Sequence, residues 1–227
     1  MKVAVVIPTR KGSQRVPSKN TKPFVDTTLL DLKIEVLKKV HSVVDIIVNS
    51  DCEESFKIAK KHNVKIHKRD PYFASSEVTT NEHWSHLADV TDADIIMLGQ
   101  TTSPLIKPVT YELALSKFMD NLAVGYDSLN TVSLIKEFLW LNGEPLNYKQ
   151  DKFPRSQDLP DVLALNFGIT IIKREVMLEK GNAVGYKPYF MKLDKYEATD
   201  IDDPFDFLFA EHLYKNVIDK TQLGVLK

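Results

Sequence analysis

The sequence has only one cysteine, Cys52, among its 227 residues. A single cysteine excludes an intrachain disulfide and makes a thiolate metal cluster untenable, so the chain fits a reducing cytoplasm. No run reaches the roughly 18 apolar residues that a membrane-spanning helix needs, and the N-terminus lacks a signal-peptide pattern. We therefore expect a soluble, unprocessed chain that does not enter a membrane.

The sequence also lacks an excess of charge. Its 30 lysines and arginines nearly balance 31 aspartates and glutamates, so no overall field favours nucleic acid or an anionic membrane as a partner. A small molecule is the expected partner. With 43% hydrophobic residues, a chain of this length can bury one good core, and we predict a single domain over residues 1–227.

The N-terminal stretch organises the chain. Residues 3–7 are a continuous apolar run, which predicts a strand buried on both faces within a parallel sheet. Pro8 and Gly12 favour an irregular loop after that strand. Loops at the carboxyl ends of such strands are where α/β proteins bind their ligands.

This loop carries unbalanced positive charge. Five cations of the loop precede the first acidic residue, Asp26: Arg10, Lys11, Arg15, Lys19 and Lys22. Gly12 and Ser13 add backbone and hydroxyl donors, a combination that can hold a polyphosphate, although a solvated basic loop is the alternative. The loop has neither the Gly-Lys-Ser/Thr ending of a Walker loop nor the three spaced glycines of a dinucleotide fingerprint.

The remaining chain alternates between helical and strand patterns. Helices are expected over residues 28–40, 79–90, 111–122 and 205–217, and strands over 43–48, 64–67, 94–100, 127–132 and 187–193. Ser50 or Asp51 is predicted to cap a helix that starts within 49–54, and Pro104 could open another. His83 and His86 have no third metal-ligating neighbour, so we assign them no chemistry.

Two polar clusters follow predicted strands. Residues 100–103 (Gln-Thr-Thr-Ser) form an uncharged hydrogen-bonding set that suits a base or a sugar. Asp200 and Asp202 are two residues apart in extended chain, so both carboxylates should point the same way. Opposite a polyphosphate loop they indicate Mg²⁺ held jointly with phosphate oxygens, with a solvated acidic turn as the alternative. Asp203 and Pro204 then predict the start of the closing helix.

Residues 133–164 differ from the rest of the chain. They contain the aromatic run Phe138-Leu-Trp140, several prolines and no long periodicity. Two explanations stay open, because the segment could be an irregular lobe that covers the substrate or an arm buried against a second subunit.

The stretch Ile7-Pro-Thr-Arg-Lys-Gly-Ser-Gln-Arg-Val-Pro-Ser-Lys-Asn20 resembles the signature loop of the acylneuraminate cytidylyltransferases, the CMP-sialic acid synthetase group, whose relatives act on Kdo, pseudaminic and legionaminic acids. Residues 197–211 resemble the Asp-Ile-Asp signature of the same family. The resemblance implies an α/β, three-layer Rossmann-like (GT-A-like) nucleotidyltransferase domain with a mostly parallel sheet, in which 133–164 is a dimerisation arm. It also implies transfer of CMP from CTP to the anomeric hydroxyl of a 2-keto-3-deoxy sugar acid, with release of pyrophosphate, by a homodimer.

The resemblance further implies roles for the residues that match its motifs. The catalytic residues would be Arg10, Arg15, Lys19 and Asp202. The nucleotide would be bound by Pro8, Thr9, Arg10, Gly12, Ser13, Lys19, Asn20, Arg69 and Ser76. The sugar acid would be bound by Gln100, Thr102, Ser103, Arg155 and Asn166, and Mg²⁺ by Asp200 and Asp202.

Two positions depart from the pattern of the sialic acid enzymes. Ala164 stands where that pattern has an arginine, and Phe167 stands where it has a glycine. Loss of a guanidinium that would pair with the sugar carboxylate argues against N-acetylneuraminate as the acceptor. The alternatives are a nucleotidyltransferase for another sugar or polyol phosphate, and a degenerate, non-catalytic nucleotide-binding dimer.

Overall fold

The computed structural model describes residues 1–217 and 223. One seven-stranded sheet forms its centre, in the order β11-β7-β10-β6-β1-β4-β5. The strands are β1 (Val3–Pro8), β4 (Asp45–Ser50), β5 (Lys65–Lys68), β6 (Ile95–Leu98), β7 (Ser128–Ile135), β10 (Val162–Lys173) and β11 (Pro188–Lys192). β10 is antiparallel to both neighbours and all other pairs are parallel, so the predicted mostly parallel sheet is confirmed.

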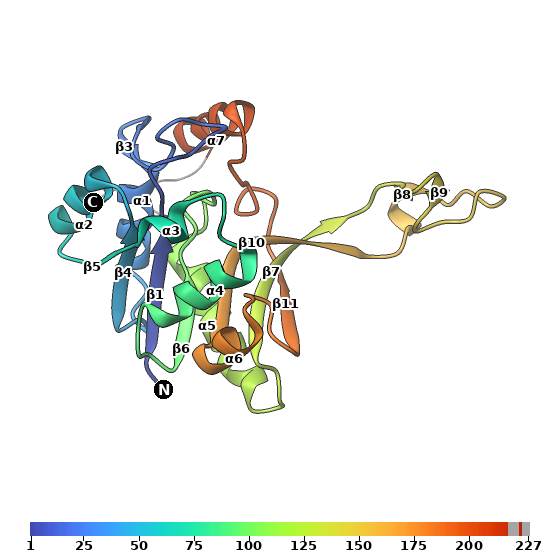
Figure 1. Ribbon diagram of the computed structural model, residues 1–227. Helices are drawn as coiled ribbons and strands as arrows, with labels where there is room; N and C mark the ends of the chain where they lie inside the picture. Colours follow the sequence, from blue (N-terminus) through green and yellow to red (C-terminus); the bar gives the residue numbers. More distant parts are fainter. Residues whose placement is uncertain (218–222, 224–227) are drawn as a thin grey trace.

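Helices cover both faces of the sheet and complete three layers (Figure 1). They are α1 (Leu29–Leu37), α2 (Glu53–Lys61), α3 (Pro71–Ala74), α4 (Thr80–Asp89), α5 (Pro108–Leu122), α6 (Arg174–Lys180) and α7 (Pro204–Asn216). The larger core contains residues of α1, α2, α5 and α7, and the smaller core contains residues of α4 and α6. No helix among the described residues is long and apolar enough to cross a bilayer.

The first strand is buried on both faces, as its composition predicts. Val5 and Ile7 pack into the larger core while Val6 packs into the smaller one. β1 pairs in parallel with β4 on one side and β6 on the other. The carboxyl ends of these three strands therefore meet at one edge of the sheet, which is the edge that the basic loop leaves.

The segment 133–164 forms an arm that projects from the body of the molecule (Figure 1). β7 and β10 pair at its base, through Val162 with Ile135 and Leu163 with Leu134. Its outer part holds the short hairpin of β8 (Trp140–Leu141) and β9 (Glu144–Pro145) and a 3-10 turn over Ser156–Asp158. The arm has strand structure at its base and extends away from the sheet of its own chain (Figure 1), and both explanations offered for it stay predictions.

Three predicted helix and strand boundaries need correction. β4 continues through Ser50, because Ser50 pairs with Lys68 in the sheet, and α2 starts only after Cys52, which makes no side-chain cap. Ser50 and Asp51 are therefore not helix caps. Pro104 does not open a helix either, since α5 begins at Pro108. The long strand β10 was not predicted.

The helix predictions at 79–90 and 205–217 are confirmed apart from their ends. Thr79 and Asp203 cap α4 and α7, and each cap is completed by an acidic side chain at the third helical position. These reciprocal capping contacts satisfy backbone N–H groups that the first turn leaves without partners. A second small hairpin, β2 (Pro23–Phe24) with β3 (Thr27–Thr28), leads from the basic loop into α1. The domain prediction extends to residue 227 and so lies partly outside the described residues.

Candidate functional site

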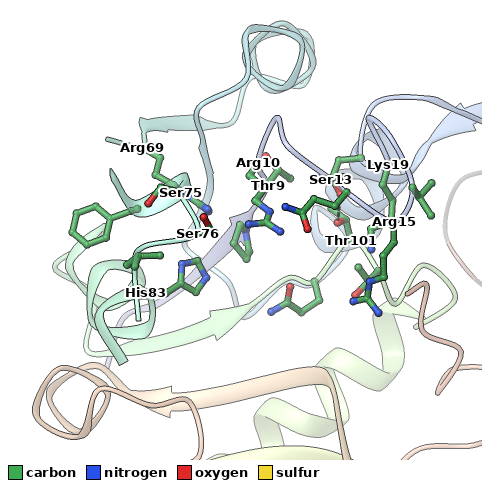
Figure 2. Close-up of a pocket in the computed structure, with 18 of the residues that line it drawn as sticks. Thr9, Arg10, Ser13, Arg15, Lys19, Arg69, Ser75, Ser76, His83 and Thr101 are labelled. Carbon is green, nitrogen blue, oxygen red and sulfur yellow. Dashed lines mark hydrogen bonds between the residues drawn. The ribbon is translucent and has the colours of Figure 1, made fainter. Parts of the chain in front are cut away.

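An open pocket of about 600 Å³ lies at the carboxyl ends of β1, β5 and β6. Three segments far apart in the sequence line it, namely the loop after β1, the segment from Arg69 to His83 and residues 100–102, and Asp202 reaches it from before α7. Figure 2 shows these side chains directed toward a shared space. The topology of the sheet therefore builds the pocket where α/β proteins bind ligands.

The first and last parts of the chain meet along one wall of the pocket. The guanidinium of Arg15 donates to a carboxylate oxygen of Asp202 at 2.8 Å. Lys19 Nζ donates to the backbone carbonyl of Ile201 at 2.6 Å. Both side chains of the Arg15–Asp202 pair are more than half exposed, so solvent weakens the pair and an anionic ligand can compete for Arg15.

Two polar contacts hold the loop that carries these cations. The Thr101 hydroxyl donates to the Asn20 side chain at 2.7 Å, which ties the loop to the end of β6. The backbone N–H of Lys11 donates to Asp51 at 2.9 Å, which ties it to the end of β4. Asp51 therefore supports the basic loop, a role different from the helix cap predicted for it.

The charges along this wall influence one another. Burial lowers the pKa of Lys19, and the nearby carboxylates of Asp200 and Asp202 act in the opposite direction. Burial raises the pKa of Asp200, which also accepts a hydrogen bond from Thr102 and is repelled by Asp202. The two carboxylates therefore lie close enough to each other and to Lys19 for their charges to interact.

These two carboxylates are the donors available for a metal ion. In the part of the chain that the structure describes, no group of three His, Cys, Asp or Glu side chains is arranged to hold a metal. Mg²⁺ commonly takes one or two carboxylates and completes its octahedron with phosphate oxygens and water. Asp200 and Asp202 fit an ion of that kind, shared with a polyphosphate, and do not fit a site built from protein ligands alone.

The opposite end of the pocket is lined by Arg69 and uncharged side chains (Figure 2). They are Phe73, Ser75, Ser76, Val78, Thr79, Thr80 and His83. Arg69 is only 3% exposed, and its burial lowers the pKa of the guanidinium to about 10, which leaves it charged at neutral pH. The pocket thus has a cationic end and a second end with one guanidinium among neutral groups.

His83 belongs to this second end, and the sequence analysis assigned it no chemistry. Burial, followed by the charges of Arg69 and Arg10, lowers the pKa of His83 to about 4. The imidazole is therefore neutral at physiological pH and can both donate and accept a hydrogen bond. The one sequence signal that could have placed His83 at the pocket was its position one helical turn after the capping Thr79, because residues at this spacing lie on the same side of a helix.

The structure brings most of the predicted site residues together. Twelve line the pocket: Pro8, Thr9, Arg10, Ser13, Arg15, Lys19, Asn20, Arg69, Ser76, Gln100, Thr102 and Asp202. Thr101, a member of the predicted set 100–103, lines it as well, and so does Gln14, which was not predicted as a ligand. The pocket lining supports grouping these residues, and their individual roles stay predictions.

Five other predicted residues do not line this pocket: Gly12, Ser103, Arg155, Asn166 and Asp200. Ser103 is buried, and its carbonyl accepts a hydrogen bond from Lys33. The Asn166 amide is used between β7 and β10, where it bonds Thr131 and Ser133. Arg155 lies on the arm, paired with Asp158 at 2.6 Å, so it does not reach the pocket of its own subunit.

Comparison with known proteins adds independent findings. The sequence profile of the cytidylyltransferase family matches residues 4–152. The chain is 28% identical over 220 residues to N-acylneuraminate cytidylyltransferase A of Danio rerio, covering 92% of this chain and 50% of that protein. It is 27% identical over 231 residues to the pseudaminic acid cytidylyltransferase of Campylobacter jejuni, covering 95% of this chain and 97% of that protein. The chain thus spans about half the length of the Danio relative and nearly all of the Campylobacter one.

A solved structure shares the whole architecture. CMP:2-keto-3-deoxy-manno-octonic acid synthetase, complexed with CTP, superimposes with a TM-score of 0.72 and covers 96% of this chain and 100% of its own. The sequences are 16% identical, so this likeness speaks for the fold alone. The predicted fold class is therefore confirmed by both the sheet topology and the structural comparison.

Proposed function

Since the chain belongs to the cytidylyltransferase family, we propose that it transfers CMP from CTP to the anomeric hydroxyl of a 2-keto-3-deoxy sugar acid and releases pyrophosphate. The observation that carries the proposal is the contact of Arg15 with Asp202 across 187 residues of sequence. It supports a single cleft in which cations from one end of the chain and carboxylates from the other bind one magnesium triphosphate.

In this reaction the hydroxyl oxygen of the acceptor attacks the α-phosphorus of CTP. The new O–P bond forms as the bond from the α-phosphorus to the bridging oxygen breaks, and pyrophosphate leaves with that oxygen while the hydroxyl proton passes to solvent. Phosphoryl transfer asks a protein mainly for positioning and for charge stabilisation. Arg10, Arg15 and Lys19 supply positive charge for the triphosphate and for the leaving pyrophosphate.

The proposal includes Mg²⁺ as the cofactor. Asp200 and Asp202 would hold it together with phosphate oxygens, and the bound ion would polarise the α-phosphate and lower the pKa of the attacking hydroxyl. Two side chains would support these carboxylates. Lys19 donates to the backbone carbonyl of Ile201, which lies between them in the sequence, and Thr102 donates a hydrogen bond to Asp200. No histidine or cysteine base is needed.

We place the nucleoside at the end of the pocket that contains Arg69, Ser76 and His83. The triphosphate would occupy the cationic end, which leaves the second end, with Arg69 among uncharged side chains, for the base and ribose. Gln100 and Thr102 lie between the two ends and would bind the nucleotide or the acceptor. The absence of an arginine at Ala164 favours an acid other than N-acetylneuraminate.

We further propose that the enzyme is a homodimer formed through the arm. Phe138, Tyr148 and Phe153 cluster on the arm with ring centroids 4.9–5.6 Å apart, and Trp140 packs against Tyr148. Trp140 is 50% and Phe153 65% exposed, and aromatic side chains of this kind are enriched in the centres of interfaces. In the dimer, Arg155 would meet the negative charge of an acceptor bound to the other subunit. The free thiol of buried Cys52 fits a cytoplasmic location.

A pyrophosphate-release assay tests the proposal. It would combine CTP and Mg²⁺ with sialic, legionaminic, pseudaminic and Kdo-type acids in turn, with UTP, ATP and GTP as nucleotide controls. We expect pyrophosphate only with CTP and with one class of acid. Sugar phosphates and polyol phosphates would be offered as alternative acceptors. Release of pyrophosphate with one of them would instead support a nucleotidyltransferase for another sugar or polyol phosphate. Binding of CTP without turnover on any acceptor would support the non-catalytic alternative, which the departures at Ala164 and Phe167 leave open and which the basic loop and the aspartate pair together speak against.

A further inference from the structure

Asn49 lies behind the pocket, at the carboxyl end of β4, and connects three other polar side chains. It is fully buried. Arg69 Nε donates to Asn49 Oδ1 at 2.6 Å, and Arg69 Nη2 donates to the Asn49 backbone carbonyl at 3.2 Å. The amide nitrogen Nδ2 lies 2.9 Å from His67 Nδ1 and 3.1 Å from His86 Nε2. The side-chain amide thus contacts one guanidinium and two imidazoles.

The chemistry of arginine fixes the direction of every hydrogen bond in this network. A guanidinium can only donate, so the atom of Asn49 that faces Arg69 must be the oxygen. The amide NH₂ therefore faces the two histidines and donates to both. It follows that both rings are neutral and that their protons sit on the opposite nitrogens, Nε2 in His67 and Nδ1 in His86.

The surroundings of His86 agree with a neutral ring. Burial lowers the pKa of His86 to about 4, and the charge of Arg69 acts in the same direction against the weaker influence of Asp89 and Asp70. His86 also stacks on Phe73, with ring centroids 4.1 Å apart and planes inclined by 13°. A neutral imidazole loses less on burial in such a stack than a charged one.

The network supports the pocket from behind through three residues that line it. Arg69 has two of its five donor hydrogens bound by Asn49, which fixes the plane of the guanidinium and leaves three N–H groups for a ligand. Phe73 rests on His86, and the backbone N–H of Thr9 donates to the Asn49 carbonyl at 2.9 Å. Within residues 1–217 and 223, no carboxylate forms an ion pair with Arg69, and the charge of Asp51 stabilises the buried guanidinium only from a greater distance.

We propose that Asn49, with His67 and His86, is a positioning unit that holds the Arg69 guanidinium toward the bound nucleotide. Asn49 touches no substrate and acts through Arg69. The identity of the ligand rests on the proposed function, whereas the orientation of the unit rests on its hydrogen bonds alone. Only a side chain with an acceptor on one side and two donors on the other satisfies all three neighbours, which explains why an asparagine occupies this position.

A double-mutant cycle on CTP affinity tests the proposal. Calorimetry would give the CTP dissociation constant of the wild type, Asn49→Leu, Arg69→Ala and the double variant. Leucine keeps the number and branching of the side-chain heavy atoms of asparagine and removes its hydrogen bonds. We expect Asn49→Leu to weaken CTP binding about tenfold, as loss of hydrogen bonds to a charged group does, and Arg69→Ala to weaken it at least as much. Because Asn49 acts through Arg69, the double variant should match Arg69→Ala within about twofold.

A matched control separates positioning from general destabilisation. Asn130 is also fully buried in the sheet, where its side chain bonds Thr170 and Ser128 away from the pocket. Asn130→Leu should lower the melting temperature and leave CTP affinity within about twofold of wild type. The proposal is overturned if Asn49→Leu binds CTP normally, or if the losses from Asn49→Leu and Arg69→Ala multiply in the double variant.

A measurement on the unaltered protein keeps the test independent of variant folding and of CTP. Nitrogen-15 spectra of labelled histidine at pH 7 report which ring nitrogen carries the proton. We expect His67 and His86 to be neutral and in opposite tautomers. A protonated ring, or the same tautomer in both, would overturn the proposal even if the enzyme turns over CTP. Conversely, opposite neutral tautomers in a protein that binds no CTP would leave the positioning unit standing and refute the proposed function.

Discussion

Replacing Lys33 by methionine should change how the stability of the protein depends on pH. Lys33 lies on α1 and is 1% exposed, with Nζ donating to the Ser103 carbonyl at 2.8 Å and to the Tyr111 hydroxyl at 2.6 Å. Burial lowers the pKa of Lys33 to about 7, with the charge of Glu197 acting against it. A lysine in the unfolded chain has a pKa of about 10.4.

The sign of the effect follows from proton binding. Below pH 7 both states carry the proton, and the folded state is destabilised by a buried charge. Between about pH 7 and pH 10.4 the unfolded chain holds a proton that the folded chain has released, so the free energy of unfolding rises with pH. One such proton contributes at most about 1.4 kcal/mol per pH unit, which gives about 2 kcal/mol between pH 7.5 and 9.5.

Urea unfolding at several pH values would measure this contribution. The difference between wild type and Lys33→Met isolates Lys33, because all other titrating groups are common to both proteins. We expect the free energy of unfolding of the wild type to gain about 2 kcal/mol relative to the variant over that range. Lys39→Met, at an exposed position shortly after the same helix, should keep the wild-type slope. Equal slopes for wild type and Lys33→Met would refute the reasoning.

Three further predictions concern the pocket and the arm. Lys19→Ala should lower turnover roughly 10- to 100-fold with little loss of stability, because it removes one charged donor; unchanged kinetics in the pyrophosphate assay would remove Lys19 from the mechanism. Asp202→Asn should abolish activity and its Mg²⁺ dependence while stability changes by less than about 1 kcal/mol, since the ion pair with Arg15 is exposed; a fully active variant would refute the metal assignment. Phe153→Asp should convert a dimer to monomers in sedimentation velocity without lowering the melting temperature, and an unaltered sedimentation coefficient would exclude Phe153 from the interface.

Local rules made much of the fold predictable from the sequence. The run at 3–7 has no polar residue, so a strand buried on both faces was the simplest reading. Asp203 before Pro204 located the start of α7, because capping depends on neighbouring residues alone. The basic loop and the aspartate pair were also visible locally, although only the folded sheet brings them within 2.8 Å of each other.

The features that sequence reasoning missed depend on contacts between distant residues. β10 was missed because its pairing with β7 shifts register between Leu165 and Thr170, which breaks the alternation expected of a strand. Phe167 lies in this irregular stretch with φ 50°, in the left-handed region that favours glycine. This backbone conformation gives a physical reason for the glycine in the sialic acid pattern, and here the Phe167 ring instead packs near Trp84.

The polar network behind the pocket could not be predicted for a related reason. Asn49, His67 and His86 come from β4, β5 and α4, and nothing in their spacing along the sequence indicates that the three side chains meet. Similarly, His83 lines the pocket only because α4 packs against the face of the sheet formed by β1, β6 and β10.

The span of 187 residues between Arg15 and Asp202 also bears on how the protein is made. A chain emerging from the ribosome exposes β1 and the basic loop well before it exposes Asp202. Most of the central sheet can form on the nascent chain before the second half of the cleft exists. The pocket is therefore complete only after Asp202 has left the ribosome, and a chain released before residue 200 would carry the basic loop without its acidic counterpart.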